Sequence, residues 1–205
     1  MHYHEALAEI RSGRFRPVYL VYGEETFLVE EVYRALRAAI VRPETADFNF
    51  HVLEPGPDQL SQALSLAQTQ PFFADRRLVV VKDCPAIVPR RKAGAEEEAQ
   101  GDAGDANLLA YLKAPVSSTV LLFLAASVDA RRKTTKALMA AGGAVECQPL
   151  KTEDAVMWVQ QRAQSEGKRL GTQAANMLVE RVGPDLGLLA GELEKLVLYV
   201  GGARE

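Results

Sequence analysis

The sequence predicts an α/β protein, with a three-layer domain built on a mostly parallel five-stranded sheet and a small three-helix domain after it. Over the first 149 residues, short apolar runs alternate with segments whose apolar residues recur at close to a 3.6-residue period. From residue 150 onward the strand signal disappears and three helical patterns follow one another. We therefore expect two domains, covering residues 1–149 and 150–205.

Five apolar runs are expected to form the strands of the first domain. They are short, rich in β-branched, leucine or aromatic residues, and separated by turn signals. Most are apolar on both alternating faces, which is typical of parallel strands covered by helices on both sides. The expected strands are Val18–Tyr22, Phe48–Leu53, Leu78–Val81, Val120–Ala125 and Ala144–Cys147.

Helical patterns separate these strands, which implies right-handed βαβ units. The charged segment Arg90–Ala106 has no apolar periodicity and is expected to be a surface loop. In the second domain, Thr152 and Thr172 are expected to be the N-caps of their helices. The expected helices are Glu25–Val41, Pro57–Gln68, Asn107–Lys113, Ala130–Ala141, Thr152–Ser165, Thr172–Val182 and Leu186–Val200.

Composition limits the classes of function. The chain has 205 residues, of which 48% are hydrophobic and 25% charged, and its net charge is −3 at pH 7. These values are ordinary for a soluble globular protein and provide no global basic field for nucleic acid. No apolar run of about 18 residues predicts a membrane span, and the N-terminus lacks a signal-peptide pattern. We expect a cytoplasmic protein whose Cys84 and Cys147 are reduced and buried.

The first expected strand runs into Gly23 and a helix, which is where nucleotide-binding α/β folds carry their phosphate loop. A working phosphate loop needs several glycines and then Lys-Ser/Thr. This loop has one glycine and no lysine, and the carboxylates of Glu24 and Glu25 would repel a triphosphate. Asp83, after the third strand, stands alone where a magnesium site would present paired acids. We therefore expect a degenerate loop at Gly23 with no nucleotide-binding residues and no cofactor.

No other residue set has the spacing of a catalytic or metal site. His2 and His4 lie at an end expected to fray, and the only other histidine is His51. The two cysteines lack metal-ligand spacing, and neither G-x-S-x-G nor H-E-x-x-H occurs. We expect no catalytic residues, no metal ligands and no intrinsic catalysis. An active P-loop-type NTPase remains as an alternative, which an ATP titration would test.

The strongest basic cluster lies after the fourth strand and contains Arg131, Arg132, Lys133 and Lys136. The side chains of Arg131, Arg132 and Lys133 could contact phosphate or an acidic partner surface. They could equally form a solvated helix start. A nucleic-acid-binding adaptor that uses residues 131–136 is therefore a second alternative, and salt-dependent DNA binding would favour it.

Three stretches, in this order along the chain, carry a family resemblance: PVYLVYGEETFLVEE at 17–31, TQPFFADRRLVVVKD at 69–83 and ELEKLVLYVG at 192–201. Together they resemble the delta subunit of bacterial DNA polymerase III, the clamp-loader subunit that opens the ring-shaped sliding clamp. The resemblance runs over essentially the whole chain. It implies an AAA+-like α/β domain with a degenerate nucleotide site, a small helical lid-like domain, and a further C-terminal helical collar domain that this chain lacks.

The resemblance also implies a binding element. In that family a hydrophobic pair just before the third strand binds the clamp, and the matching stretch here is Gln70, Pro71, Phe72 and Phe73, with Phe72 at the usual leucine position. Two adjacent phenylalanines can bury roughly a few hundred Å² in a partner pocket. The alternative is that one or both rings close the base of the domain as part of its core.

The partners implied by the resemblance are the beta sliding clamp, the ATPase gamma/tau subunits, the delta prime subunit, and DNA within the assembled loader. No membrane is implied. The expected role is in DNA replication. DNA-directed DNA polymerase activity would belong to the chain only through its association with the holoenzyme.

Overall fold

The computed structural model describes residues 1–89 and 104–201. The chain divides into two compact units, Met1–Cys147 and Gln148–Glu205, and each is described by itself. Within the described residues, no helix is long and apolar enough to cross a membrane.

Unit 1 is built on a five-stranded sheet in the order β2-β3-β4-β1-β5. Every pairing in it is parallel, which agrees with the apolar character of the runs, because parallel strands are covered on both faces. All residues of β4, and all of β3 except its last, are buried. The strands are β1 (Val18–Tyr22), β2 (Phe50–Leu53), β3 (Arg77–Lys82), β4 (Thr119–Ala125) and β5 (Ala144–Glu146).

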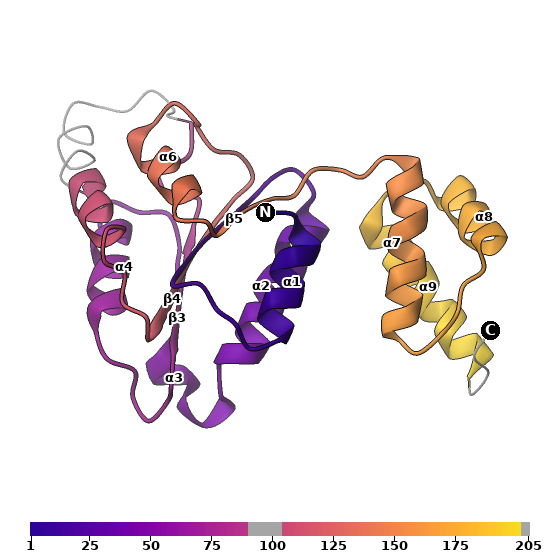
Figure 1. The fold of residues 1–205 in the computed structure, drawn as a ribbon, viewed down its shortest axis with the longest axis horizontal. Coiled ribbons are helices and arrows are strands. Elements are labelled where there is room, and N and C mark those ends of the chain that lie inside the picture. The colour runs from indigo at the N-terminus through magenta and orange to yellow at the C-terminus, as the bar shows by residue number, and fades with distance from the viewer. Residues whose placement is uncertain (90–103, 202–205) are drawn as a thin grey trace. The chain divides into compact units, whose positions relative to one another are not determined.

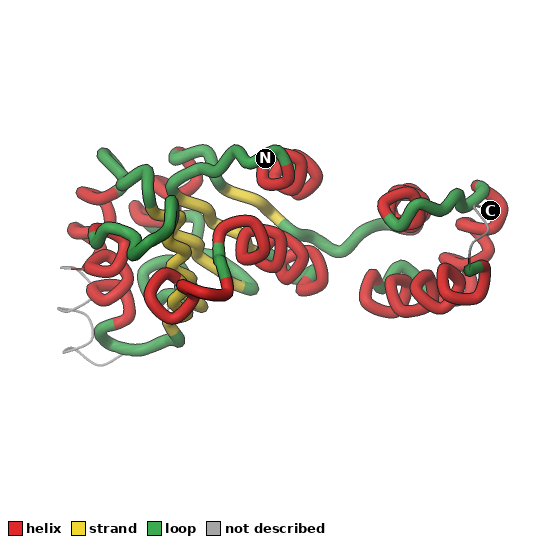
Figure 2. Tube along the Cα trace, turned by 90° about the horizontal axis from the view of Figure 1, so that it is seen from below, coloured by secondary structure: helices red, strands yellow, loops and turns green. Residues whose placement is uncertain are grey.

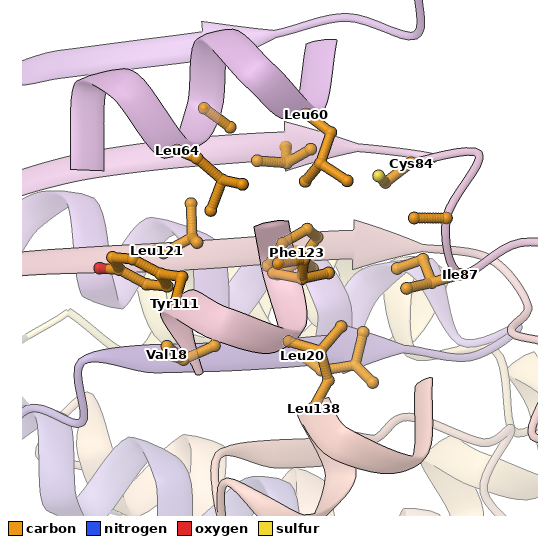
Figure 3. Close-up of a cluster of buried hydrophobic side chains, with 14 of the residues drawn as sticks. Val18, Leu20, Leu60, Leu64, Cys84, Ile87, Tyr111, Leu121, Phe123 and Leu138 are labelled. Carbon is orange, nitrogen blue, oxygen red and sulfur yellow. The ribbon is translucent and has the colours of Figure 1, made fainter. Parts of the chain in front are cut away.

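Helices cover both faces of this sheet, which confirms the predicted three-layer α/β architecture (Figures 1 and 2). On one face, α4, the helical residues 104–111 and α6 enclose a core with Leu64, Leu121, Phe123 and Leu138 (Figure 3). On the other face, α2 packs against β1 and β3, and α1 packs against α2. The helices of unit 1 with defined bounds are α1 (Tyr3–Arg11), α2 (Thr26–Ile40), the 3-10 turn η1 (Pro43–Thr45), α3 (Ala46–Asn49), α4 (Gln59–Gln68) and α6 (Lys133–Ala140).

Several local features differ from the sequence-based expectation. The first residues do not fray: Tyr3–Arg11 form α1, which buries Tyr3, Ala6, Leu7 and Ile10 at helical spacing. Phe48 does not begin the second strand but lies in the short helix α3, since pairing of β2 with β3 starts at Phe50. The expected loop Arg90–Ala106 falls mostly outside the described residues, and its last three residues are helical.

Unit 2 is a small bundle of α7 (Thr152–Ser165), α8 (Thr172–Val182) and α9 (Leu186–Val200), with the helix bounds expected from the sequence. Its core includes Trp158, Val179 and Leu189. The N-cap predictions were wrong, because Lys151 and Gly171 occupy the cap positions and the threonines are already helical. By contrast, the Asp185 carboxylate caps α9 by accepting a hydrogen bond from the Leu188 N–H at 2.9 Å.

Candidate partner-binding surface

The loop between α4 and β3 holds two phenylalanine rings outside the core. The residue exposure is 48% for Phe72 and 81% for Phe73. Phe48 of α3 is 55% exposed, and its ring centroid lies 4.8 Å from that of Phe72. The Phe72 and Phe73 rings meet edge to face at 4.6 Å. We call Phe48, Phe72 and Phe73 the aromatic surface. It lies at the amino-terminal ends of β2 and β3.

A buried asparagine holds the backbone of this loop. Asn49, which is 2% exposed, accepts a hydrogen bond from the Phe72 N–H at its Oδ1, at 2.8 Å. Its Nδ2 donates to the Phe72 carbonyl at 2.8 Å and to the Thr45 carbonyl at 3.2 Å. Both backbone polar groups of Phe72 are therefore satisfied by one side chain, which leaves the ring free to point outward.

A buried arginine holds the other side of the loop. The Arg77 guanidinium donates to the Leu66 carbonyl at 3.0 Å and to the Gln70 carbonyl at 3.1 Å. Desolvation lowers the pKa of Arg77 from its ordinary value, although the group stays charged at neutral pH. From its place next to Asp75 and Arg76, Arg77 would be expected to belong to a polar rim around the phenylalanines, but it is buried. Its two hydrogen bonds join the end of α4 to the loop that carries the phenylalanines.

Backbone geometry at the tip of the loop is unusual. Phe73 has a φ of 47°, in the left-handed region that bulky side chains rarely adopt. Such a residue costs on the order of 1–3 kcal/mol and persists only where its surroundings determine it. Here the anchors at Asn49 and Arg77 flank it. In the same loop, Gln70 is exposed and Pro71 is half-buried.

Charged residues lie around the aromatic surface. Asp75 forms an exposed ion pair with Arg42 at 3.1 Å. Arg76 donates to the Ser117 carbonyl at 2.6 Å, and its guanidinium lies 5.3 Å from the centroid of the Phe15 ring. Exposed pairs of this kind contribute little stability. They provide a polar border beside an apolar patch, which is the usual anatomy of a protein-binding surface.

The loop at Gly23 lies at the carboxyl end of β1, at the opposite end of the sheet. The Gly23 N–H donates to the Ala125 carbonyl at 3.2 Å, and the Glu25 N–H donates to the Cys147 carbonyl at 3.0 Å. At the start of α2, the Phe27 N–H donates to the Glu25 carboxylate at 3.1 Å. These are the amides that a phosphate loop would direct at its ligand, and here they bond to the protein's own acceptors.

Gly23 has a different structural role. Its φ is 138°, and a Cβ at this position would lie 2.0 Å from the Cys147 carbonyl oxygen. Glycine is therefore required by the close approach of two backbone segments. Asp83, at the end of β3, has a φ of 43° and its N–H donates to the Leu124 carbonyl at 2.8 Å. No group of three or more His, Cys, Asp or Glu within residues 1–89 and 104–201 could hold a metal ion.

The structure separates the members of the basic cluster. Arg131 is exposed and pairs with both carboxylate oxygens of Asp129, at 2.9 and 3.0 Å, and this bond lowers the pKa of Asp129 to about 2. Arg132 is largely buried, where it donates to the Pro85 carbonyl and bonds to Asp105 at 3.0 Å. Lys133 is exposed at the first turn of α6. Arg132 thus bridges parts of the fold, while Arg131 and Lys133 face solvent.

The fold and the surface together define a three-layer α/β protein with a parallel sheet, in which the amides of the loop after β1 bond to the protein's own acceptors and an exposed aromatic surface lies at the far end of the sheet. The family profile for "DNA polymerase III, delta subunit" matches residues 19–148. The chain therefore belongs to the DNA polymerase III delta-subunit family.

Two relatives agree with this assignment. The DNA polymerase III subunit delta of Bacillus subtilis is 33% identical over 198 residues, which cover 96% of this chain and 56% of that protein. The solved structure of the Bacillus subtilis DNA clamp loader delta protein YqeN superposes with a TM-score of 0.81 at 31% identity, over 99% of this chain and 59% of that one. The chain thus spans a little over half the length of the relatives it matches.

Proposed function

We propose that this chain binds the beta sliding clamp of DNA polymerase III through Phe72 and Phe73 and helps to open the ring during DNA replication in the cytoplasm. The observation that carries the proposal is the exposed phenylalanine pair, held outward by buried polar anchors, in a member of the delta-subunit family. Gln70 and Pro71 complete the binding element. The residues around Gly23 supply no ATP hydrolysis in this proposal.

The mechanism is mechanical. An apolar pair entering a pocket of the clamp gains free energy by losing contact with water, and aromatic anchors of this kind dominate many interfaces. That free energy opens the ring only to the extent that the chain binds the open form more tightly than the closed form. ATP-driven work would come from the gamma/tau subunits, acting with the delta prime subunit and with DNA in the assembled loader.

Equilibrium binding to the purified beta clamp tests the proposal. We expect Phe72→Ala/Phe73→Ala to weaken binding about a hundredfold or more, because two hot-spot rings are lost. Leu198→Ala/Tyr199→Ala is the matched control, since these neighbours in α9 are also exposed and apolar, and it should bind like the parent. Clamp affinity unchanged in the Phe72/Phe73 variant would overturn the proposal. A parallel titration with labelled ATP and magnesium should show no micromolar binding.

A further inference from the structure

Besides Arg77, which bonds to Gln70, two residues outside the 70–73 element contact it directly. Phe48 and Asn49 contact Phe72, lie 23 or more positions before it in the sequence and belong to α3. The pairing of β2 with β3, in which Phe50 lies opposite Leu78, brings the turn before β2 beside the loop before β3. Phe48 then packs on Phe72 from the outside, and Asn49 binds its backbone from the inside.

We propose that Phe48 is a third contact residue for the sliding clamp and that Asn49 is the positioning residue that orders Phe72 for binding. The inference rests on the proposed function and deepens it. It makes the clamp-binding surface a joint product of two segments, residues 48–49 and residues 72–73.

Phe48 joins the two phenylalanines of the loop in one contiguous group, because the Phe48 and Phe73 rings both lie within 5 Å of the Phe72 ring, centroid to centroid. A single exposed phenylalanine is unremarkable, but a contiguous exposed aromatic group is typical of a binding surface. A partner that covers Phe72 and Phe73 would also reach the ring beside them. Phe48 is therefore continuous with the element that the delta-subunit family implies.

Asn49 orders the loop through its hydrogen bonds. Its amide spans both backbone groups of Phe72 and uses its remaining donor on Thr45 in its own turn. The loop is thereby tied to α3 at the residue that precedes the strained Phe73. Binding by a flexible loop loses free energy to ordering, and a loop that is already ordered avoids that loss. Asn49 therefore acts on the clamp through Phe72 and needs no contact of its own.

Amide hydrogen exchange measures the positioning role without the clamp. In Asn49→Ala, the Phe72 amide loses its acceptor and should exchange at least about tenfold faster, while the amides of β3 keep their protection. In Asn49→Asp, the carboxylate can still accept from the Phe72 N–H but cannot donate to the Phe72 and Thr45 carbonyls, so the exchange rate should lie between those of the parent and of Asn49→Ala. A Phe72 amide that exchanges equally slowly in Asn49→Ala overturns the role of Asn49.

Clamp affinity measures the functional part. We expect Phe48→Ala to weaken binding about fivefold and Phe48→Leu about twofold, since an aromatic contact is lost in whole or in part. Asn49→Ala should weaken it about tenfold at a temperature where its melting curve shows the variant to be fully folded. Met157→Ala is the control. The exposed fraction of Met157, 53%, is close to the 55% of Phe48, but Met157 lies in unit 2.

The outcomes separate the two proposals. If Phe72→Ala/Phe73→Ala loses binding while Phe48→Ala and Asn49→Ala bind like the parent, this inference fails and the proposed function stands. If the Phe72/Phe73 variant itself keeps full affinity, the proposed function fails and the contact role of Phe48 fails with it. Weakened binding in all three variants, with the Met157 control unchanged, supports both.

Discussion

Replacing Gly23 by alanine tests whether this glycine serves backbone packing. The added Cβ would lie 2.0 Å from the Cys147 carbonyl oxygen, far inside normal contact. The clash can be relieved only by separating the end of β1 from the end of β5. That movement strains the Glu25 N–H to Cys147 carbonyl bond at 3.0 Å and the Cys147 N–H to Tyr22 carbonyl bond at 2.7 Å. The φ of 138° adds a further conformational cost.

The magnitude follows from these contributions. A residue forced into a backbone region suited to glycine costs on the order of 1–3 kcal/mol, and each lost hydrogen bond costs about 1 kcal/mol. We therefore expect Gly23→Ala to lower the free energy of unfolding of unit 1 by about 3–5 kcal/mol. That is a large share of the roughly 5–15 kcal/mol typical of a domain.

Gly13→Ala is the matched control. Gly13 also has a positive φ, at 76°, but nothing lies within 4 Å of the position its Cβ would take. It should therefore cost only about 1 kcal/mol, the conformational part alone. A loss for Gly23→Ala within about 1 kcal/mol of that for Gly13→Ala would refute the reasoning.

Hydrogen exchange of the most protected amides of β1 and β4 is the suitable assay. The single tryptophan, Trp158, lies in unit 2, so its fluorescence would report on the other unit. Folded Gly23→Ala molecules should still bind the clamp with parent affinity, because the aromatic surface lies at the opposite end of the sheet.

Two further predictions concern buried groups. Arg77→Met keeps the apolar stem but removes the donors to the Leu66 and Gln70 carbonyls. We expect the free energy of unfolding to fall by about 2–3 kcal/mol and amide hydrogen exchange to become faster in the loop before β3. Unchanged amide exchange in that loop would contradict this. Burial raises the pKa of the Cys84 thiol to about 11 and that of Cys147 to about 12, so both are protonated at neutral pH. Thiol labelling at pH 8 should therefore be slow in the native chain and fast in urea, and rapid native labelling would contradict this. Because the thiols of the unfolded chain ionise from about pH 9 while the buried thiols stay protonated up to about 11 and 12, stability should fall as the pH rises above about 9.

Much of the fold was predictable because its signals are local. The β1 run VYLVY and the bounds of all three helices of unit 2 follow from short apolar patterns that tertiary contacts did not override. The helix α1 was equally readable, since Tyr3, Ala6, Leu7 and Ile10 have helical spacing, but its position at the chain end obscured it. The N-caps at Thr152 and Thr172 were predicted wrongly because a threonine at the first helical position looks the same in sequence as one at the cap.

The candidate site was predictable only in part. Phe72 and Phe73 could be named from a family resemblance, and the absence of lysine after Gly23 led to the expectation of a degenerate loop. Nothing in the sequence pointed to Asn49 or Arg77 as anchors. A buried asparagine or arginine has no periodic pattern, and its value depends on carbonyl groups supplied by distant residues.

Local apolar periodicity therefore determined the α/β class and the order of elements, and three stretches of the sequence carried the family resemblance. Only the tertiary structure decided that both phenylalanines face solvent, that Phe48 joins them, and that Asn49 holds them in place. The physical reason is register. Residues 49 and 72 meet because β2 and β3 pair with Phe50 opposite Leu78, and that pairing is set by the packed core on both faces of the sheet.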